Sequence, residues 1–121
     1  MPKRVLALGL DPSCAAPDGL ASLTADVIKA YIDSQLERVR ALGFEVEPCL
    51  VDSGATAEAV LAEELRSRRF DCIMIGAGLR AQPRLLLFER LLNLIHAHAP
   101  GAKICFNTTP ADTAEAVQRW I

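Results

Sequence analysis

The sequence of 121 residues is poor in aromatic side chains and has no strong excess of charge of either sign. Only 5% of its residues are aromatic, so smaller aliphatic side chains must fill most of the core. The formal net charge of −2 gives no electrostatic attraction to nucleic acid or to an anionic membrane. We therefore expect neither of these among its partners.

Long apolar runs are also missing. No segment approaches the roughly 18 consecutive apolar residues that a membrane-spanning helix needs. The start MPKRVLALGLDP superficially resembles a signal peptide, but its apolar run stops at Asp11 and Pro12, and no small-residue cleavage site follows. We expect a cytoplasmic protein.

The four cysteines lack the spacing of a zinc site, because no C-x-x-C pair occurs. Cys49, Cys72 and Cys105 fall inside apolar runs, where a thiol behaves as a small buried hydrophobe. Cys14 alone lies in a predicted loop. In a reducing compartment a disulfide framework is not expected, and no metal site is predicted.

Four apolar runs predict β-strands over residues 4–10, 44–51, 72–75 and 103–106. Three of these runs are nearly continuous in apolar residues, as expected for strands covered on both faces of a parallel sheet. The run over 44–51 alternates instead, and its Pro48 suits an edge strand.

Helices are predicted over residues 24–42, 56–68, 83–97 and 109–120. Thr24, Thr56 and Thr109 are candidate N-caps, Pro83 fits a first helical turn, and Gly43 fits a helix stop. The alternation of strand and helix predicts a single α/β domain over residues 1–121. We expect a doubly wound parallel four-stranded sheet of order 2-1-3-4, flavodoxin-like, with helices on both faces.

Two of these helices have broad apolar faces. That of helix 24–42 carries Val27, Ile28, Tyr31, Ile32, Leu36 and Val39. The leucines, isoleucine and phenylalanine of helix 83–97 cover about half of its circumference, against the roughly 100° of an ordinary surface helix, and Leu86 lies outside even that arc. Deep packing against the sheet and a homodimer interface both explain helix 83–97, and both interpretations stay open.

A ligand site in such a fold lies beyond the carboxyl ends of the strands, where the strand order reverses. Loops from all four strands and all four helix N-termini reach this edge, where an anion or a polar ligand is favoured. The candidate ligand-binding residues are Asp11, Ser13, Asp52, Gly76, Gly78, Arg80, Asn107 and Thr108.

Folding alone explains several of these candidates. Gly76 and Gly78 permit a tight turn, and Asp52 can bond the backbone of its own turn. Arg80 is less easily explained by folding, because a turn does not need a guanidinium. Its structural alternative is a surface ion pair. The predicted loop over 11–23 exceeds the usual 2–6 residues of such connections and is interpreted as a lid or as a surface excursion.

The chemical patterns at this edge are incomplete. GAGLRA (76–81) matches the spacing of a dinucleotide-binding turn, but the next strand is followed by the neutral Asn107 where an acid is required. A phosphatase loop needs C-x5-R, and the sixth residue after Cys14 is Leu20. A receiver domain needs an aspartate where Gly76 stands, and His96 and His98 do not share a helix face for a metal.

The segments GLDP, LVDSGATAEAV, FDCIMIGAGLR, LLLFERLLNLIHAHAP and KICFNTTPADT cover most of the chain. In these segments it resembles a family of small flavodoxin-like α/β proteins without an established activity. The resemblance implies the fold and a shared site at the strand ends, and it implies no catalytic residues.

Two functional hypotheses follow. The first is binding of a small polar or anionic metabolite, phosphorylated ones included, at the strand ends. The second is a non-enzymatic interaction module that dimerises through the leucine-rich helix 83–97. No residue pattern identifies a cofactor or a reaction.

Overall fold

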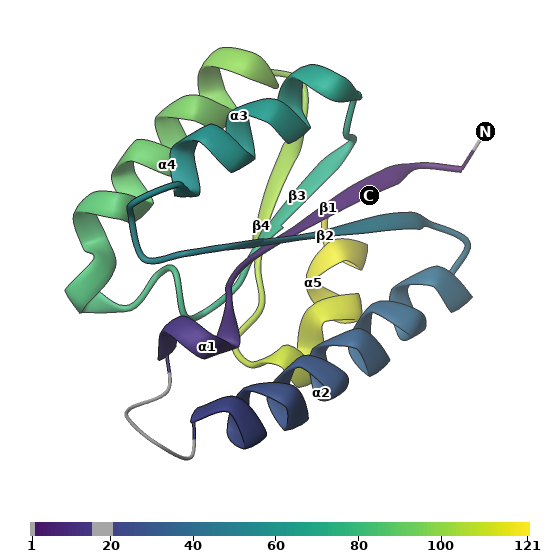
Figure 1. Cartoon of the computed structure of the whole chain (residues 1–121). Coiled ribbons are helices and arrows are strands. Elements are labelled where there is room, and N and C mark those ends of the chain that lie inside the picture. Colours follow the sequence, from purple (N-terminus) through teal and green to yellow (C-terminus); the bar gives the residue numbers. More distant parts are fainter. Residues whose placement is uncertain (1, 16–20) are drawn as a thin grey trace.

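The sheet has the predicted strand order. The structure is a computed structural model that describes residues 2–15 and 21–121. Its four parallel strands lie in the order β2-β1-β3-β4 (Figure 1). Their bounds are Arg4–Leu10 for β1, Glu45–Val51 for β2, Cys72–Ile75 for β3 and Lys103–Phe106 for β4. The predicted flavodoxin-like α/β fold is confirmed, and three of the four strands have the predicted bounds.

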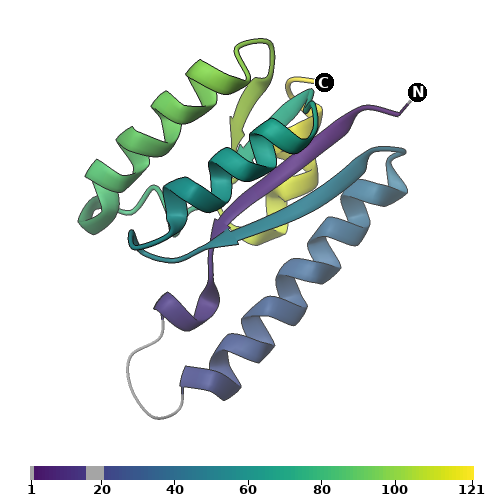
Figure 2. The same cartoon turned by 45° about the horizontal axis from the view of Figure 1, so that its top comes forward.

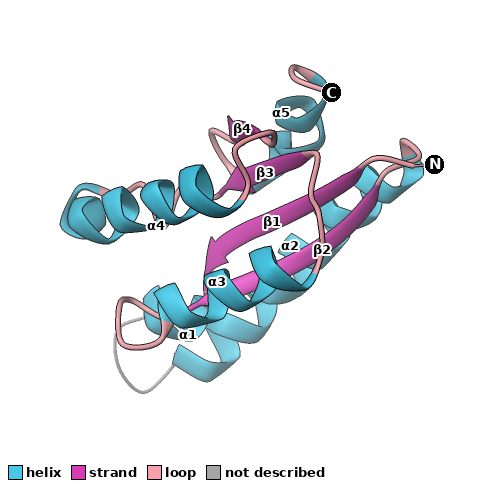
Figure 3. Ribbon diagram, turned by 90° about the horizontal axis from the view of Figure 1, so that it is seen from above, coloured by secondary structure: helices cyan, strands magenta, loops and turns pink. Residues whose placement is uncertain are grey.

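The helices cover both faces of the sheet (Figures 1 and 3). One face packs against α3 and α4, and the other packs against α2 and α5. Their bounds are Ala21–Ala41 for α2, Ala57–Ser67 for α3, Leu85–His98 for α4 and Thr113–Gln118 for α5. Short helical turns precede three of them: α1 at Pro12–Ala15, η1 at Gln82–Arg84 and η2 at Pro110–Asp112.

Strand β1 supplies side chains to both cores. Because successive side chains of a strand point to opposite faces, Leu6 and Leu8 pack towards α3 and α4, whereas Val5 and Ala7 pack towards α2 and α5. Both sets are buried. The unbroken apolar run of this strand is therefore explained by burial on its two faces.

The connection after β1 differs from the predicted loop over 11–23. Residues 12–15 form α1, and α2 already begins at Ala21, so Thr24 lies inside a helix and is not its N-cap. The rest of the predicted loop, 16–20, lies outside the described residues. The predicted helix stop is confirmed at Gly43, which has a φ of 94° and follows the end of α2 by two residues.

Helix α2 is longer than the sheet that it covers. Its 21 residues span about 31 Å, whereas the seven residues of β1 span about 23 Å. Figure 2 shows its first half extending past the strand ends. The predicted apolar face is buried at Leu36 and Val39 and partly buried at Ile32, while Val27 and Tyr31 are 64% and 45% exposed.

Helix α4 packs on the sheet with most of its leucine-rich face. Leu87, Leu91 and Ile95 are buried, and Phe88 and Leu92 are partly buried against the same core. Leu86 is 68% exposed, as its place outside the apolar arc predicts. Burial in the domain thus accounts for these positions of the helix, and Leu85 and Leu86 are left on the surface.

Within the described ranges, no helix combines the length with the apolar character that crossing a bilayer requires.

Two leucines of α4 test this packing. We expect Leu91→Ala to lower the free energy of unfolding by about 2–5 kcal/mol, because it leaves a cavity in the core. Leu86→Ala should change it by no more than about 0.5 kcal/mol, because that side chain is exposed. Urea denaturation followed by circular dichroism measures both, and equal losses would contradict the described orientation of α4.

Candidate functional site

The predicted site residues lie where the strands end. Asp11 directly follows β1, Asp52 follows β2, Gly76 follows β3 and Asn107 follows β4. All four strands are parallel, so these positions share one edge of the sheet. The point where the strand order reverses lies between β1 and β3, beside the turn that contains Gly76 and Gly78.

Asp11 and Ser13 bond to each other. The Asp11 carboxylate accepts hydrogen bonds from the backbone N–H of Ser13 at 3.0 Å and from its hydroxyl at 2.8 Å. This arrangement satisfies donors at the start of α1. Both side chains therefore have a local structural role at the strand edge.

Asp52 also acts within its own turn. Its carboxylate accepts from the backbone N–H of Gly54 at 3.1 Å, from that of Thr56 at 3.0 Å and from the Thr56 hydroxyl at 2.8 Å. The Thr56 hydroxyl, followed by these N–H groups, holds the pKa of Asp52 below its ordinary value. Thr56 occupies the predicted N-cap position of α3, but its side chain accepts no cap bond, and its hydroxyl donates to Asp52.

Thr108 is held by Asp112, a residue outside the predicted set. Its hydroxyl donates to the Asp112 carboxylate at 2.6 Å, and its backbone N–H donates at 2.8 Å. The same hydroxyl is the main cause of the lowered pKa of Asp112. Thr109 accepts from the Ala111 N–H at 3.2 Å, so its predicted N-cap is confirmed. The spacing T-x-x-D is the sequence signal for this capping box.

Arg80 ties the ends of β3 and β4 together. Its Nε donates to the carbonyl of Ile75 at 3.1 Å, and its Nη2 donates to the side-chain Oδ1 of Asn107 at 3.1 Å and to the Asn107 carbonyl. The guanidinium also lies 4.9 Å from the ring centroid of Phe106. The expectation that folding makes no use of this guanidinium is therefore wrong. The proposed surface ion pair is also wrong for the described residues, where Arg80 forms none.

The turn after β3 is packed closely on β1. A Cβ atom added to Gly78 would lie 3.2 Å from Cβ of Leu10, which is tighter than ordinary contact. Neither Gly76 nor Gly78 has a positive φ. Close approach of the turn to β1 therefore explains Gly78 better than a left-handed turn conformation does.

A cavity of about 230 Å³ lies between α2 and the carboxyl half of the sheet. Its floor includes the small residues Ala7 and Gly9, and α2 covers it with Ile28 and Ile32. The other residues that line it are Leu8, Leu10, Pro12, Gln35, Leu36, Pro48, Leu50, Met74, Gly76, Ala77, Gly78, Asn107, Pro110 and Thr113. Three of the predicted residues, Gly76, Gly78 and Asn107, thus border one apolar space.

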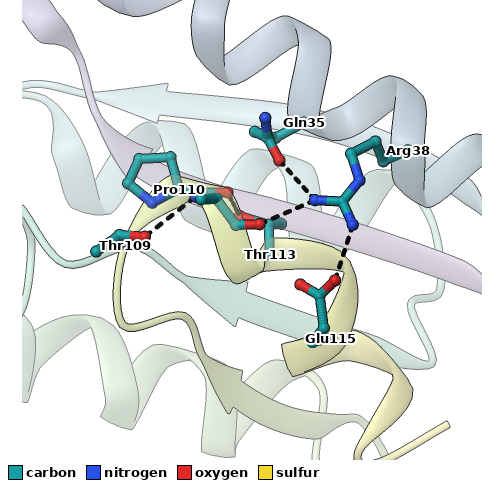
Figure 4. A network of polar contacts seen from close by, with 7 residues as sticks. Gln35, Arg38, Thr109, Pro110, Thr113 and Glu115 are labelled. Atoms are coloured by element: carbon teal, nitrogen blue, oxygen red, sulfur yellow. Dashed lines mark hydrogen bonds and ion pairs between the residues drawn. The ribbon is translucent and has the colours of Figure 1, made fainter.

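A polar network fixes the second half of α2 beside this cavity (Figure 4). Arg38 donates to the Gln35 side chain at 3.1 Å, to the carbonyl of Ala111 at 2.9 Å and to the carboxylate of Glu115 at 2.8 Å. These bonds join α2 to η2 and α5. The cavity lies beside the second half of α2 and extends towards the first half, where Ile28 lines it.

The remaining side chains offer little other chemistry. Cys49, Cys72 and Cys105 are buried as predicted, and burial raises the pKa of the Cys49 thiol to about 12. Sγ of Cys72 and Sγ of Cys105 lie 3.5 Å apart inside the core. In the described part of the chain, no cluster of three or more His, Cys, Asp or Glu residues is suited to hold a metal ion.

Comparison of the sequence with protein-family models and with curated proteins gives no match.

Arg80 and Arg84 form a matched pair for testing this edge. We expect Arg80→Met to lower the free energy of unfolding by about 1–3 kcal/mol, because it leaves the carbonyls of Ile75 and Asn107 without a charged donor. Among the described residues, Arg84 makes one long bond of 3.4 Å, and its buried Nε has no partner. Arg84→Met should therefore be neutral or slightly stabilising in the same urea titration. A neutral Arg80→Met would contradict the structural role of Arg80.

Proposed function

We propose that this chain binds a small molecule in the cavity between α2 and the carboxyl half of the sheet. The observation that carries the proposal is the position of the cavity, beside the turn where the strand order reverses. Open α/β sheets bind their ligands at this point. The cavity also has the usual composition of a ligand site, an apolar lining with few polar groups.

The size of the cavity limits its ligand. An apolar cavity of about 150 Å³ is large enough for benzene. The cavity of about 230 Å³ therefore fits one substituted ring or a short acyl chain. It is smaller than the roughly 300–1,000 Å³ of typical cofactor and drug sites, which argues against an enclosed dinucleotide.

The body of the ligand is proposed to be apolar. The sequence predicts a polar or anionic ligand, with Arg80 and the helix N-termini holding an anion and Asp11, Asp52 and Asn107 orienting polar groups. The carboxylates of Asp11 and Asp52 accept hydrogen bonds from their own turns, and neither residue lines the cavity. The floor and the cover of the cavity are aliphatic, so any polar recognition is confined to its border.

The side chain of Met74 provides a direct measurement of binding. The chain has two methionines, Met1 and Met74, and Met74 lines the cavity. In protein labelled with [¹³C-methyl]methionine, we expect hexanoate, hexanol and benzoate, tested one at a time, to include at least one that shifts the Met74 signal. Gly9→Val should abolish that shift, because the new side chain projects from the cavity floor.

Gly101→Val is the matched control. A Cβ atom at Gly101 meets no heavy atom within 4 Å, and this residue lies outside the cavity lining. In Gly101→Val, each probe should shift the Met74 signal as much as it does in the wild type. A Met74 signal that none of these probes shifts, or one that shifts equally in Gly9→Val, would contradict binding in this cavity.

Dimerisation through α4 is the second candidate function. Leu85 and Leu86 are adjacent, large, apolar and exposed, which favours a protein contact at the start of this helix. Sedimentation equilibrium should then show a concentration-dependent dimer, and Leu86→Glu should be monomeric. A wild type that is monomeric throughout the concentration range would exclude this function.

A further inference from the structure

The described residues that line the cavity carry no charge. None of them is an aspartate, a glutamate, a lysine, an arginine or a histidine. Three of them have polar side chains, namely Gln35, Asn107 and Thr113. An ionised group inside the cavity would therefore have to find its partner among three neutral side chains and the backbone.

Two of these polar side chains are bonded to each other. Nδ2 of Asn107 donates to the hydroxyl of Thr113 at 3.1 Å, and that hydroxyl donates to the carbonyl of Pro110 at 2.8 Å. Oδ1 of Asn107 accepts from Nη2 of Arg80 at 3.1 Å. Both Asn107 and Thr113 are buried, and their polar groups bond within the domain, as buried polar groups generally do.

The third polar side chain is held by Arg38. Oε1 of Gln35 accepts from this guanidinium at 3.1 Å, and the same guanidinium donates to the carbonyl of Ala111 (Figure 4). The charge of Arg38 is paired with the carboxylate of Glu115 at 2.8 Å, and neither residue lines the cavity. On the helix side, the polar lining is thus the neutral amide of Gln35.

The backbone of the cavity floor is used by the sheet. Strand β1 pairs with β2 on one side and with β3 on the other. The N–H of Gly76, directly after β3, donates to the carbonyl of Leu8 at 2.9 Å. Ala77 and Gly78 follow in an exposed turn, where water reaches the backbone. The floor is therefore dry and satisfied, and the polar part of this border lies in water.

The charges around the cavity do not favour an ion of either sign. Asp11, Asp52 and Asp112 stand at the same edge as Arg80 and Arg84, and none of these five residues lines the cavity. The three carboxylates accept hydrogen bonds from their own turns. The guanidinium of Arg80 donates to backbone carbonyl groups. Neither an acid nor an amine gains a charged partner by entering the cavity.

From this lining we infer that the ligand is uncharged. A charged group that enters an apolar space loses its hydration, and only an ion partner or several hydrogen bonds can offset this loss. The ligand is a neutral hydrocarbon ring or chain with at most one neutral polar group, bound above Ala7 and Gly9. The inference rests on the proposed function, since it names the chemical class that this cavity accepts and excludes acids and amines of the same size.

Two pairs of probes that differ chiefly in charge test this inference. Hexanamide is compared with hexanoate, and hexanol with hexylamine, by titration at pH 7 into protein labelled with [¹³C-methyl]methionine while the Met74 signal is followed. Each neutral probe should bind at least about tenfold more tightly than its charged counterpart, because only the charged one loses strong hydration. Hexanoate and hexylamine have opposite charges, so a general attraction of the protein for one sign would not weaken both.

A new cation beside the cavity provides the complementary test. Ile28 lines the cavity and is 37% exposed, so Ile28→Lys adds an ammonium group there without burying it. The affinity for hexanoate relative to hexanamide should then rise about two- to fivefold, which is the size of one exposed ion pair. Val27→Lys is the matched control. Val27 is the neighbouring residue of α2, is 64% exposed and lies outside the lining, so this variant should leave the ratio unchanged.

The outcomes distinguish the inference from the proposed function. If hexanoate or hexylamine binds as tightly as its neutral counterpart, the inference is wrong, but the cavity still binds small molecules. If the ratio rises equally in Ile28→Lys and Val27→Lys, or rises in neither, the lack of a charged partner is not the cause of selectivity, and the inference is overturned. If none of the four probes shifts the Met74 signal, the inference and the proposed function both fail.

Discussion

Helix α2 is anchored to the domain through its second half, and the candidate site depends on this arrangement. Leu36 and Val39 are buried against the sheet, and Arg38 is bonded to η2 and α5. The first half extends past the strand ends with Val27 and Tyr31 exposed. Since Ala7 and Gly9 are small, the space below Ile28 and Ile32 is not filled by side chains. Helix length and residue size at the end of β1 together produce the cavity.

The strands were predictable because each depends on a local pattern. A strand buried on both faces is a short apolar run bounded by turn residues, and β1 and β3 have the burial and the bounds that this pattern predicts. Strand β4 also has the predicted bounds, but it is an edge strand with Phe106 39% exposed. The start of α2 was not predictable in this way. Ala21 precedes the candidate cap Thr24, and the periodicity of the apolar residues does not show where α2 leaves the sheet. That point depends on the relative lengths of two elements.

The sequence predicts which residues stand at the strand ends but not the bonds that they make. Topology alone brings Asp11, Asp52, Gly76 and Asn107 to one edge. It does not show that both aspartates accept bonds from their own turns, or that Arg80 bonds carbonyl groups. The cavity itself is formed by side chains of α2, β1, β2 and β3 that are far apart in the sequence. Its volume depends on packing across these elements, which no local pattern records.

The close contact between Gly78 and Leu10 gives the cavity walls of different stiffness. The turn after β3 and the end of β1 are in direct contact, and Arg80 also joins this turn to β4, so this side of the mouth is rigid. On the opposite side, α2 contacts the short helix α1 and buries Ala25 in its first half, but leaves Val27 and Tyr31 exposed. For a ligand bound as proposed, we expect extra thickness towards the helix to be accommodated by a small tilt of α2, whereas extra atoms towards the sheet would meet the backbone of β1 and the turn packed on it. Selectivity in such a cavity is directional.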